Sequence, residues 1–407
     1  MTPSQSQNER PEVLLTHTYY QAQDHHRPPH MVPLPPLLPA SLAAWLEQEA
    51  GARTQQWDST FRVGPESFEI AVSRLAPLCV WLFTHPTTRE AAHLMIRAAR
   101  ASGAVVIVGG PDAGLRGESY LRAGAHAAVI GEGEASLLPL FVGLRGQQFR
   151  PDEGLFARTP GVAFLDSEGK LCRSVAKAQP IDMDALPRPL RDPVDTRIHT
   201  QRWSDLGRGA ALSLTSSRGC PVVCGFCTNS VFGRPYRRRR PDEVVSEMED
   251  LVYAYDLDRL LFDDETFLFD SLWLKEFGTS LRDRGLRIPF EASAHPAYLD
   301  PTVLPLLREV GLDYVDLQAT SGSSPLLERL GWSHTPADVY RAAGHLKDAG
   351  IDVGLQIFVG LPGETRDDLD ASMEMVRAIG PRGVEVTRVD PGSPALFRKD
   401  WERVVGG

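Results

Sequence analysis

Three cysteines within eight residues constrain this chain more than any other feature. Cys220, Cys224 and Cys227 follow the spacing Cys-x3-Cys-x2-Cys inside the segment from Ser217 to Cys227. Thiolates this close together converge on one metal centre, and iron–sulfur clusters are held by cysteine thiolates. Three thiolates on a cluster of four irons leave one iron open for a substrate or cofactor. The spacing therefore favours an open iron–sulfur site.

Two other uses of these cysteines have less support. A structural zinc site requires a fourth ligand and closed coordination. No Cys or His follows Cys227 before His295, although a distant ligand would complete such a site. A disulfide is weaker still, because three is an odd number and the context is predicted to be cytosolic.

The composition excludes several classes of protein. The chain has 407 residues and a net charge of −10, which gives no electrostatic case for nucleic-acid binding. No apolar run approaches the roughly 18–20 residues that span a bilayer. The first ten residues are polar, lack the apolar core of a signal peptide and are predicted to form a disordered tail. We therefore expect a cytoplasmic protein without a membrane partner.

The cysteine segment resembles the cluster loop of radical SAM enzymes. In that family the open iron binds the amino and carboxylate groups of S-adenosylmethionine (SAM), and Phe226 matches the family's aromatic position. Residues 212–215 are predicted to form the first barrel strand, with the loop at its C-terminal end. The resemblance implies a partial (β/α)6 TIM-type barrel over 211–407, a [4Fe-4S] cluster, SAM, and a reductant such as flavodoxin or ferredoxin.

Residues 11–145 show the alternation of a doubly wound, Rossmann-like α/β domain. Buried strands are predicted at 77–83, 104–108 and 127–130, with helices between them. Two of the strands end in glycine turns, and these turns contain Gly109, Gly110, Gly131, Glu132, Gly133 and Glu134. Paired glycines after a buried strand either form a tight turn or let the backbone approach a ligand.

Together these features resemble the cobalamin-binding domain that precedes many radical SAM domains. The resemblance implies that the residues of the two glycine turns contact cobalamin. The Asp-x-His-x-x-Gly motif, which supplies an axial His in some mutases, is absent, and His126 lacks that pattern. The resemblance therefore implies cobalamin without a protein imidazole on its lower face, or a domain that has lost the cofactor.

Residues 146–210 are predicted to be a linker. A hairpin is expected from 161–164 and 170–173, followed by a proline-rich strap along the surface. Further on, four consecutive arginines occupy 237–240. Such a run is usually solvated, and the functional alternative is contact with an acidic substrate or a cofactor phosphate.

A run of three carboxylates, Asp263, Asp264 and Glu265, follows the predicted strand 258–262. Such a run is able to bind a hard metal, cap the next element or face a cationic group. The radical SAM resemblance favours the last use, beside the methionine ammonium of SAM, and leaves open which carboxylate makes the contact.

Three later strand ends also match positions that contact SAM in the family. Ser293 matches a ribose-contacting position, and Gly360 lies in a motif that lines the adenine pocket. His295 is interpreted either as a ligand contact or as a satisfied His at a strand end. Thr320 stands where the family has Glu, and a neutral hydroxyl cannot replace a charged hydrogen bond; Gln318 is the residue expected to compensate.

The leading hypothesis is a cobalamin-dependent radical SAM methyltransferase acting on an unactivated carbon or phosphorus, in natural-product or peptide-modifying metabolism. The resemblance implies a small-molecule or peptide substrate. Many family members have a further C-terminal domain that covers the substrate, whereas this sequence stops at Gly407, so we expect an open barrel mouth that suits a large or peptide substrate. Two alternatives stay open: a radical cyclase or rearrangement enzyme without methyl transfer, and a non-catalytic iron–sulfur binding protein. No catalytic acid or base is assigned.

Overall fold

The chain forms two compact units. The computed structural model describes residues 10–24, 32–222 and 235–389. One unit comprises 1–196 with 230–232, and the other comprises 197–229 with 233–407. The boundary therefore falls within the predicted linker, and each unit is described by itself.

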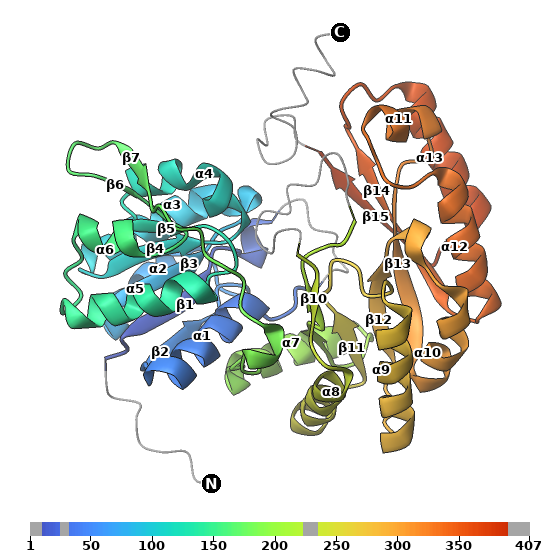
Figure 1. The fold of residues 1–407 in the computed structure, drawn as a ribbon, viewed down its shortest axis with the longest axis horizontal. Coiled ribbons are helices and arrows are strands. Elements are labelled where there is room, and N and C mark those ends of the chain that lie inside the picture. The colour runs from blue at the N-terminus through green and yellow to red at the C-terminus, as the bar shows by residue number, and fades with distance from the viewer. Residues whose placement is uncertain (1–9, 25–31, 223–234, 390–407) are drawn as a thin grey trace. The chain divides into compact units, whose positions relative to one another are not determined.

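The first unit is built on a seven-stranded sheet with the order β2-β1-β3-β4-β5-β6-β7 (Figure 1). Strands β1 to β5 are parallel, and β6 and β7 add an antiparallel edge. In chain order they are β1 (Val13–His17), β2 (Thr54–Trp57), β3 (Cys79–Phe83), β4 (Val105–Gly109), β5 (Ala127–Val129), β6 (Val162–Leu165) and β7 (Leu171–Arg173). The doubly wound prediction is confirmed. The predicted hairpin forms as β6 and β7, but it extends this sheet and is not part of a free linker.

Helices cover both faces of this sheet (Figure 1). One face packs Val13 and Trp81 against α1, α5 and α6, and the other packs Leu14 and Val80 against α2, α3 and α4. Burial on both faces explains why these strands are almost continuously apolar. The helices are α1 (Leu37–Ala50), α2 (Pro65–Leu75), α3 (Arg89–Ala101), α4 (Pro111–Arg122), α5 (Glu134–Gly146) and α6 (Glu153–Arg158). Helix α7 (Pro193–Asp205) follows.

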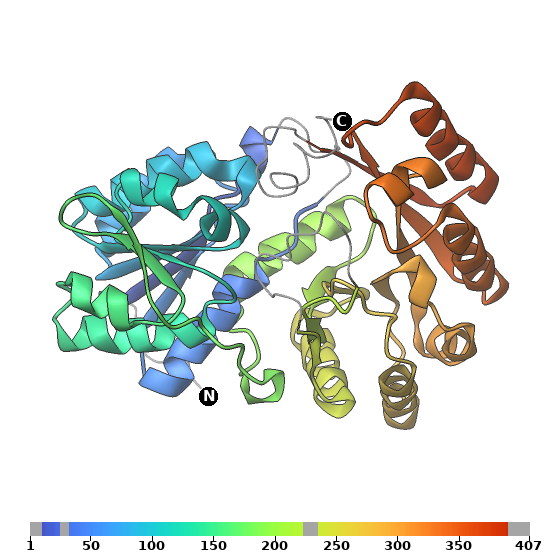
Figure 2. The same ribbon diagram turned by 45° about the horizontal axis from the view of Figure 1, so that its top comes forward.

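The second unit is a curled, open sheet of six parallel strands, in the order β15-β14-β13-β12-β11-β8. The strands are β8 (Ala211–Leu214), β11 (Arg259–Phe262), β12 (Phe290–Ala294), β13 (Leu312–Thr320), β14 (Asp352–Val359) and β15 (Gly383–Arg388). Helices lie outside the curve (Figures 1 and 2): α8 (Pro241–Tyr255), α9 (Ser271–Arg284), α10 (Leu304–Val310), α12 (Pro336–Asp348) and α13 (Arg366–Ile379). The short helix α11 (Ser324–Arg329) packs instead at the carboxyl end of the sheet, where Leu326 clusters with Leu361 and Val389. This architecture confirms the predicted partial barrel.

Strand β13 shows how the barrel presents polar groups. Val315, Leu317 and Ala319 belong to the core shared with the surrounding helices. The alternate residues, including Asp316 and Gln318, face the inner side of the curve, because side chains alternate along a strand. The carboxyl ends of parallel strands share one edge, so the predicted SAM contacts on β11 to β14 gather there.

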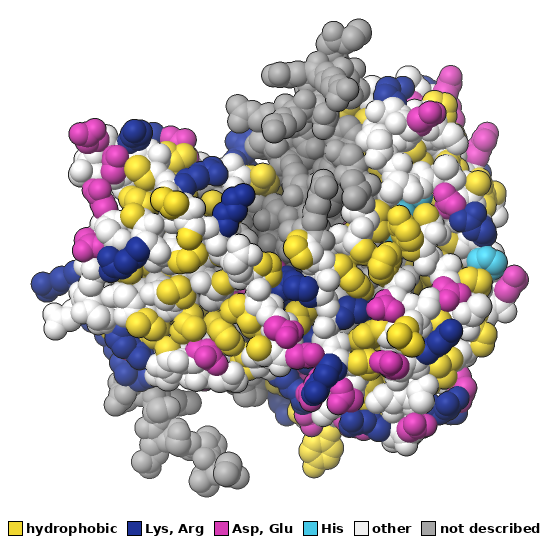
Figure 3. Space-filling model, in the orientation of Figure 1, with side chains coloured by type: hydrophobic (Ala, Val, Ile, Leu, Met, Phe, Trp, Pro, Cys, Tyr) yellow, Lys and Arg dark blue, Asp and Glu magenta, His cyan; other side chains and the backbone are white. Residues whose placement is uncertain are grey.

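The surface of the described residues carries mixed charge. Acidic and basic side chains are interspersed over the face drawn in Figure 3. Among the helices of the described residues, none has the length and apolar character needed to cross a membrane.

Gly322, just after β13, provides a test of the packing between the barrel sheet and α13. A Cβ atom at Gly322 would lie 2.3 Å from the carbonyl oxygen of Ala371. We expect Gly322→Ala to lower the free energy of unfolding by about 1–3 kcal/mol, because backbone must move to admit the methyl group. Denaturant unfolding followed by circular dichroism measures this.

Gly344→Ala in α12 is the matched control. Nothing lies within 4 Å of a Cβ atom there, and the position is exposed. Alanine should therefore raise stability by about 0.5–1 kcal/mol. Equal effects of the two substitutions would contradict the packing described.

Candidate active site

The cysteine loop is closed at its base by a short antiparallel ribbon. Strands β9 (Ser217–Arg218) and β10 (Arg237–Arg238) pair with each other, so the loop begins and ends at one place. Cys220 follows β9 as a half-buried thiol, and its Sγ lies 3.8 Å from Thr266 Oγ1. The first cysteine is thus adjacent to the carboxylate run. Cys224, Phe226 and Cys227 lie outside the described residues.

Asp264, the middle carboxylate, is buried and fully engaged. It accepts hydrogen bonds from the Ser216 backbone N–H at 3.0 Å, from Ser216 Oγ at 2.8 Å and from Ser217 Oγ. Burial raises the pKa of Asp264, while Arg238 and the serine hydrogen bonds oppose that rise. Asp264 therefore joins the end of β11 to the residues that start the cysteine loop.

Asp263 and Glu265, on either side, are exposed. Within the described part of the chain, neither side chain forms a hydrogen bond or an ion pair. The surrounding protein and the charges of Asp264 and Glu265 raise the pKa of Asp263 to about 7, although its side chain keeps contact with solvent. Partial desolvation by the surrounding protein and the charge of Asp264 also raise the pKa of Glu265. A cationic ligand would relieve this concentration of negative charge.

Ser293 and Gln318 bind the backbone of the carboxylate run. Ser293 Oγ donates to the carbonyl oxygen of Asp264 at 2.7 Å, and Gln318 Nε2 donates to that of Glu265 at 2.6 Å. Both residues thus reach the predicted region, where they hold β11, β12 and β13 together at their ends. Whether either also contacts a ligand stays a prediction.

Gly360 and Thr320 both adopt left-handed backbone conformations. Gly360 has φ of +80° and donates its N–H to Glu364 Oε2 at 2.6 Å. Thr320 has φ of +61° and is only 1% exposed. Thr320, which stands where the radical SAM family has Glu, is therefore a buried residue.

His295 is buried and satisfied by other protein groups. Its Nδ1 accepts the Ala297 N–H at 3.3 Å, and its Nε2 lies 3.0 Å from Ser333 Oγ and 3.3 Å from His334 Nδ1. Burial and His334 lower the pKa of His295 to about 4, so the ring is neutral at pH 7. This favours the interpretation as a satisfied His. His334 was missed from the sequence, because nothing in its local pattern marks it.

The arginine run is mostly internal, contrary to the expected solvated run. Arg238 stacks on Trp273 at 3.8 Å and donates to the Phe267 carbonyl oxygen at 2.8 Å. Arg239 pairs with Glu247 and donates to the Thr215 carbonyl oxygen. Arg240 is the exposed member and pairs with Glu243. The run fixes the base of the cysteine loop through tertiary contacts that a charge pattern does not reveal.

The glycine turns of the first unit are needed by its own packing. Gly110 has φ of +96°, and a Cβ atom there would lie 2.6 Å from the Thr84 carbonyl oxygen. Gly133 has φ of +108°, and its Cβ would press on Leu42. These contacts support the tight-turn interpretation. Glu134 is buried, and its carbonyl oxygen accepts the Trp45 indole N–H at 3.2 Å.

Two buried polar atoms beside these turns lack partners among the described residues. They are Trp81 Nε1 and Ser136 Oγ. A Cβ atom at Gly109 would lie 2.7 Å from the Trp81 ring, so the indole packs on the first turn. Ser136 lies in the first turn of α5, just after Gly131, Glu132 and Gly133. Buried polar groups normally have partners, so a bound ligand fits this edge of the sheet.

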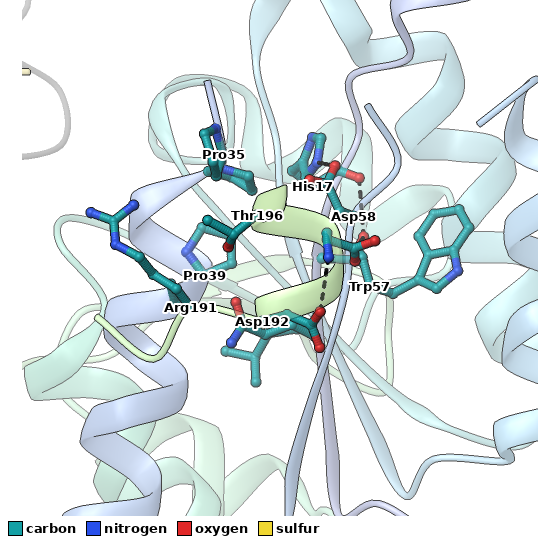
Figure 4. Close-up of a pocket in the computed structure, with 14 residues that line it drawn as sticks. His17, Pro35, Pro39, Trp57, Asp58, Arg191, Asp192 and Thr196 are labelled. Atoms are coloured by element: carbon teal, nitrogen blue, oxygen red, sulfur yellow. Dashed lines mark hydrogen bonds and ion pairs between the residues drawn. The ribbon is translucent and has the colours of Figure 1, made fainter. Parts of the chain in front are cut away.

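A separate small cavity lies at the ends of β1 and β2 (Figure 4). His17 Nε2 lies 2.8 Å from Asp58 Oδ1 there, and Pro35 and Pro39 line the opposite wall. The cavity measures about 30 Å³, enough for one or two waters but not for a cofactor. His25, His26 and His30, which lie between β1 and α1 in the sequence, are outside the described residues.

The sequence model of the radical SAM superfamily matches residues 214–376. This chain carries a radical SAM domain. The match begins at the end of β8 and includes the cysteine loop, the carboxylate run and the ends of β12 to β14. Such domains use a [4Fe-4S] cluster and SAM, so the open iron–sulfur interpretation of the cysteines is supported over zinc.

The chain is also similar in sequence to full-length proteins of other organisms. It is 29% identical over 258 residues to the anaerobic magnesium-protoporphyrin IX monomethyl ester cyclase of Rubrivivax gelatinosus, covering 63% of this chain and 45% of that protein. It is 26% identical over 306 residues to an uncharacterized methyltransferase of Pyrococcus horikoshii, and this match covers 74% of this chain and 63% of that protein. The chain thus spans about half the length of the curated relatives it matches.

Solved structures share the two-unit fold. TsrM of Kitasatospora setae, a radical SAM methyltransferase solved with tryptophan and a SAM analogue, superposes with a TM-score of 0.71 and 20% identity, covering 92% of this chain and 72% of TsrM. OxsB, a cobalamin-dependent SAM radical enzyme solved with aqua-cobalamin, superposes with a TM-score of 0.75 and 17% identity. The superposition covers 97% of this chain and 55% of OxsB. At these identities the likeness concerns the fold alone.

Asp264→Asn tests the structural role of the middle carboxylate. We expect a loss of about 1–3 kcal/mol in the free energy of unfolding, because an amide cannot accept all the serine hydrogen bonds. Asp263→Asn is the neighbouring control and should cause no loss, since its carboxylate has no partner among the described residues. Denaturant unfolding of the two variants at pH 7.5 checks this, and a greater loss in the Asp263 variant would refute it.

The pKa of Asp263 predicts a pH dependence. Unfolded aspartate ionises near a pKa of about 3.9, whereas folded Asp263 holds its proton up to about pH 7. The folded state therefore binds the extra proton, and this group lowers stability as the pH rises from about 4 to 7. Asp263→Asn should lose less stability than the wild type between pH 5.5 and pH 7.5 in denaturant unfolding. Identical pH slopes would disprove the raised pKa.

Proposed function

We propose that this protein is a cobalamin-dependent radical SAM enzyme that methylates an unactivated carbon or phosphorus of a natural product or peptide. The observation that carries the proposal is the pairing of the two units. A radical SAM domain follows a doubly wound unit whose sheet order, β2-β1-β3-β4-β5, has its switch point between β1 and β3. In such sheets ligands bind outside the carboxyl ends of the strands, near that point.

In the radical SAM domain, Cys220, Cys224 and Cys227 would hold the cluster. Asp263 and Glu265 are the carboxylates available to the cationic methionine end of SAM, because Asp264 is occupied by Ser216 and Ser217. Ser293 and Gln318 keep these carboxylates in place through the backbone. When bound, a reduced cluster would supply the electron for SAM cleavage, and cobalamin would supply the methyl group.

In the first unit, the fit to cobalamin rests on two buried polar groups that lack partners among the described residues, at the carboxyl edge of the sheet. Trp81 Nε1 and Ser136 Oγ are donors for a ligand that reaches between the two glycine turns. Thr84 donates to the Gly109 carbonyl oxygen from both its N–H at 2.8 Å and its Oγ1 at 2.9 Å, which fixes the first turn. The first unit thus offers a fixed edge beside two donors that no described residue occupies.

A radical cyclisation or rearrangement without methyl transfer is the second candidate. The similarity to the cyclase of Rubrivivax gelatinosus favours it as much as the similarity to a methyltransferase favours the first. Both candidates need the same cluster and the same SAM site, so the products of SAM distinguish them.

Mass spectrometry of those products tests the proposal. The protein is purified without oxygen, its cluster is reconstituted, and cobalamin, SAM and a strong reductant are added. 5′-Deoxyadenosine together with S-adenosylhomocysteine supports radical methylation. 5′-Deoxyadenosine alone supports cyclisation or rearrangement, and S-adenosylhomocysteine alone supports non-radical methyl transfer. Neither product, with a full cluster present, favours an iron–sulfur binding protein without turnover.

Cys220→Ala tests the cluster assignment. We expect loss of nearly all cluster iron and of both SAM-derived products, because three thiolates are the minimum set for this site. Cys172→Ala is the control, since Cys172 is a half-exposed thiol on β7 of the other unit, and it should keep wild-type iron and products. Iron analysis and absorption spectra measure both. Survival of iron and turnover in the Cys220 variant would show that the site is elsewhere.

A further inference from the structure

Thr320 is held in a conformation that its side chain disfavours. Its φ of +61° lies in the left-handed region, where a β-branched residue is an outlier. The pairing of β13 with β14 also shifts between Leu317 and Thr320. Such strain persists only where the surrounding structure over-determines it, and it concentrates at functional sites.

A pair of buried histidines holds one side of this turn. His334 Nε2 lies 3.0 Å from the Ala319 carbonyl oxygen, so Nε2 carries the proton and donates. His334 Nδ1 is then an acceptor, and His295 Nε2 lies 3.3 Å from it. His295 Nδ1 accepts the Ala297 N–H, so its proton is on Nε2. One set of neutral tautomers therefore satisfies the whole chain from Ala297 to Ala319.

Burial agrees with this neutral arrangement. His295 is 1% exposed and His334 is 3% exposed. Burial lowers the pKa of both rings, with Asp338 opposing the shift from the start of α12. The ring of Tyr298 also packs against His295, 5.1 Å away between centroids.

Helix α13 holds the other side of the turn. Ser372 Oγ accepts the Gly322 N–H at 2.9 Å and lies 3.1 Å from Ser321 Oγ. The Ser321 N–H closes the turn itself by donating to the Ala319 carbonyl oxygen at 2.7 Å. The turn is thus fixed between His334 and Ser372, with Thr320 at its centre.

The turn also determines where Gln318 lies. Gln318 directly precedes Ala319, and its side-chain amide donates to the Glu265 carbonyl oxygen at 2.6 Å. A relaxed turn would move this amide away from the carboxylate run. The contacts therefore connect His295, His334, Ala319, Gln318 and Glu265 in one continuous path.

We propose that His334 is a positioning residue for SAM: it holds the Ala319 carbonyl oxygen, keeps Thr320 left-handed, and so keeps Gln318 on the backbone of Glu265. This rests on the proposed binding of SAM beside Asp263 and Glu265. His334 itself touches neither carboxylate. If His334 only supported the fold, the affinity for SAM would not depend on the conformation of Thr320.

The test is the affinity for SAM of the full chain with its cluster reconstituted, measured without oxygen by equilibrium dialysis. His334→Ala should weaken SAM binding about tenfold, because the turn loses its donor. His334→Gln keeps a donor near the Nε2 position and should stay within about threefold of wild type. His334→Asn, whose amide is too short to reach Ala319, should weaken binding as Ala does.

A double-mutant cycle separates positioning from general stability. Glycine adopts positive φ freely, so the Thr320→Gly variant should form the left-handed turn without the hydrogen bond from His334. Adding His334→Ala to Thr320→Gly should then change SAM affinity by less than about threefold. Iron content and thermal unfolding are measured for every variant. If His334→Ala does not fold, the comparison of His334→Gln with His334→Asn tests the inference in its place.

The outcomes separate this inference from the proposed function. A tenfold loss that the Thr320→Gly background removes supports the inference. The same loss in both backgrounds, or unchanged affinity in His334→Ala and His334→Asn, overturns it while SAM binding stands. A wild-type protein with a full cluster that fails to bind SAM overturns the proposed function and the inference with it.

Discussion

The buried carboxylate of Asp264 is the interaction on which the candidate site depends. It receives three hydrogen bonds from Ser216 and Ser217, which lie on the far side of the cysteine loop in sequence. A buried charge is tolerated only with such compensation. Because Asp264 is turned inward, Asp263 and Glu265 remain exposed. One buried hydrogen-bond acceptor therefore positions both the loop that carries Cys220 and the carboxylates beside it.

Most polar side chains near the site bind other parts of the protein. Ser293 and Gln318 bind backbone carbonyl oxygens, and Arg238 and Arg239 brace the base of the cysteine loop. These hydrogen bonds leave few polar groups for a ligand, so Asp263 and Glu265, which have no partner among the described residues, stand out. Rigid support of a few free groups is what a binding site for a charged cofactor requires.

In the first unit the two glycine turns serve two purposes. Their positive φ angles and close contacts are required by the fold, as Gly110 against Thr84 shows. The same close packing leaves Trp81 Nε1 and Ser136 Oγ without partners among the described residues. A tight turn and a ligand-binding edge are therefore compatible, although a glycine pair in a sequence favours one or the other.

The sequence by itself determined the two α/β units, the cysteine loop and the polar strand ends. Apolar periodicity reports how a whole element is buried, and parallel strands bring their carboxyl ends to one edge. Only the tertiary structure decided that Asp264 is buried and structural while Asp263 and Glu265 are exposed, and that His295 pairs with His334. It also decided that Arg238 and Arg239 are internal and that the hairpin joins the sheet. Each of these depends on a partner far away in the chain, as Ser216 is from Asp264, and local patterns carry no information about such partners.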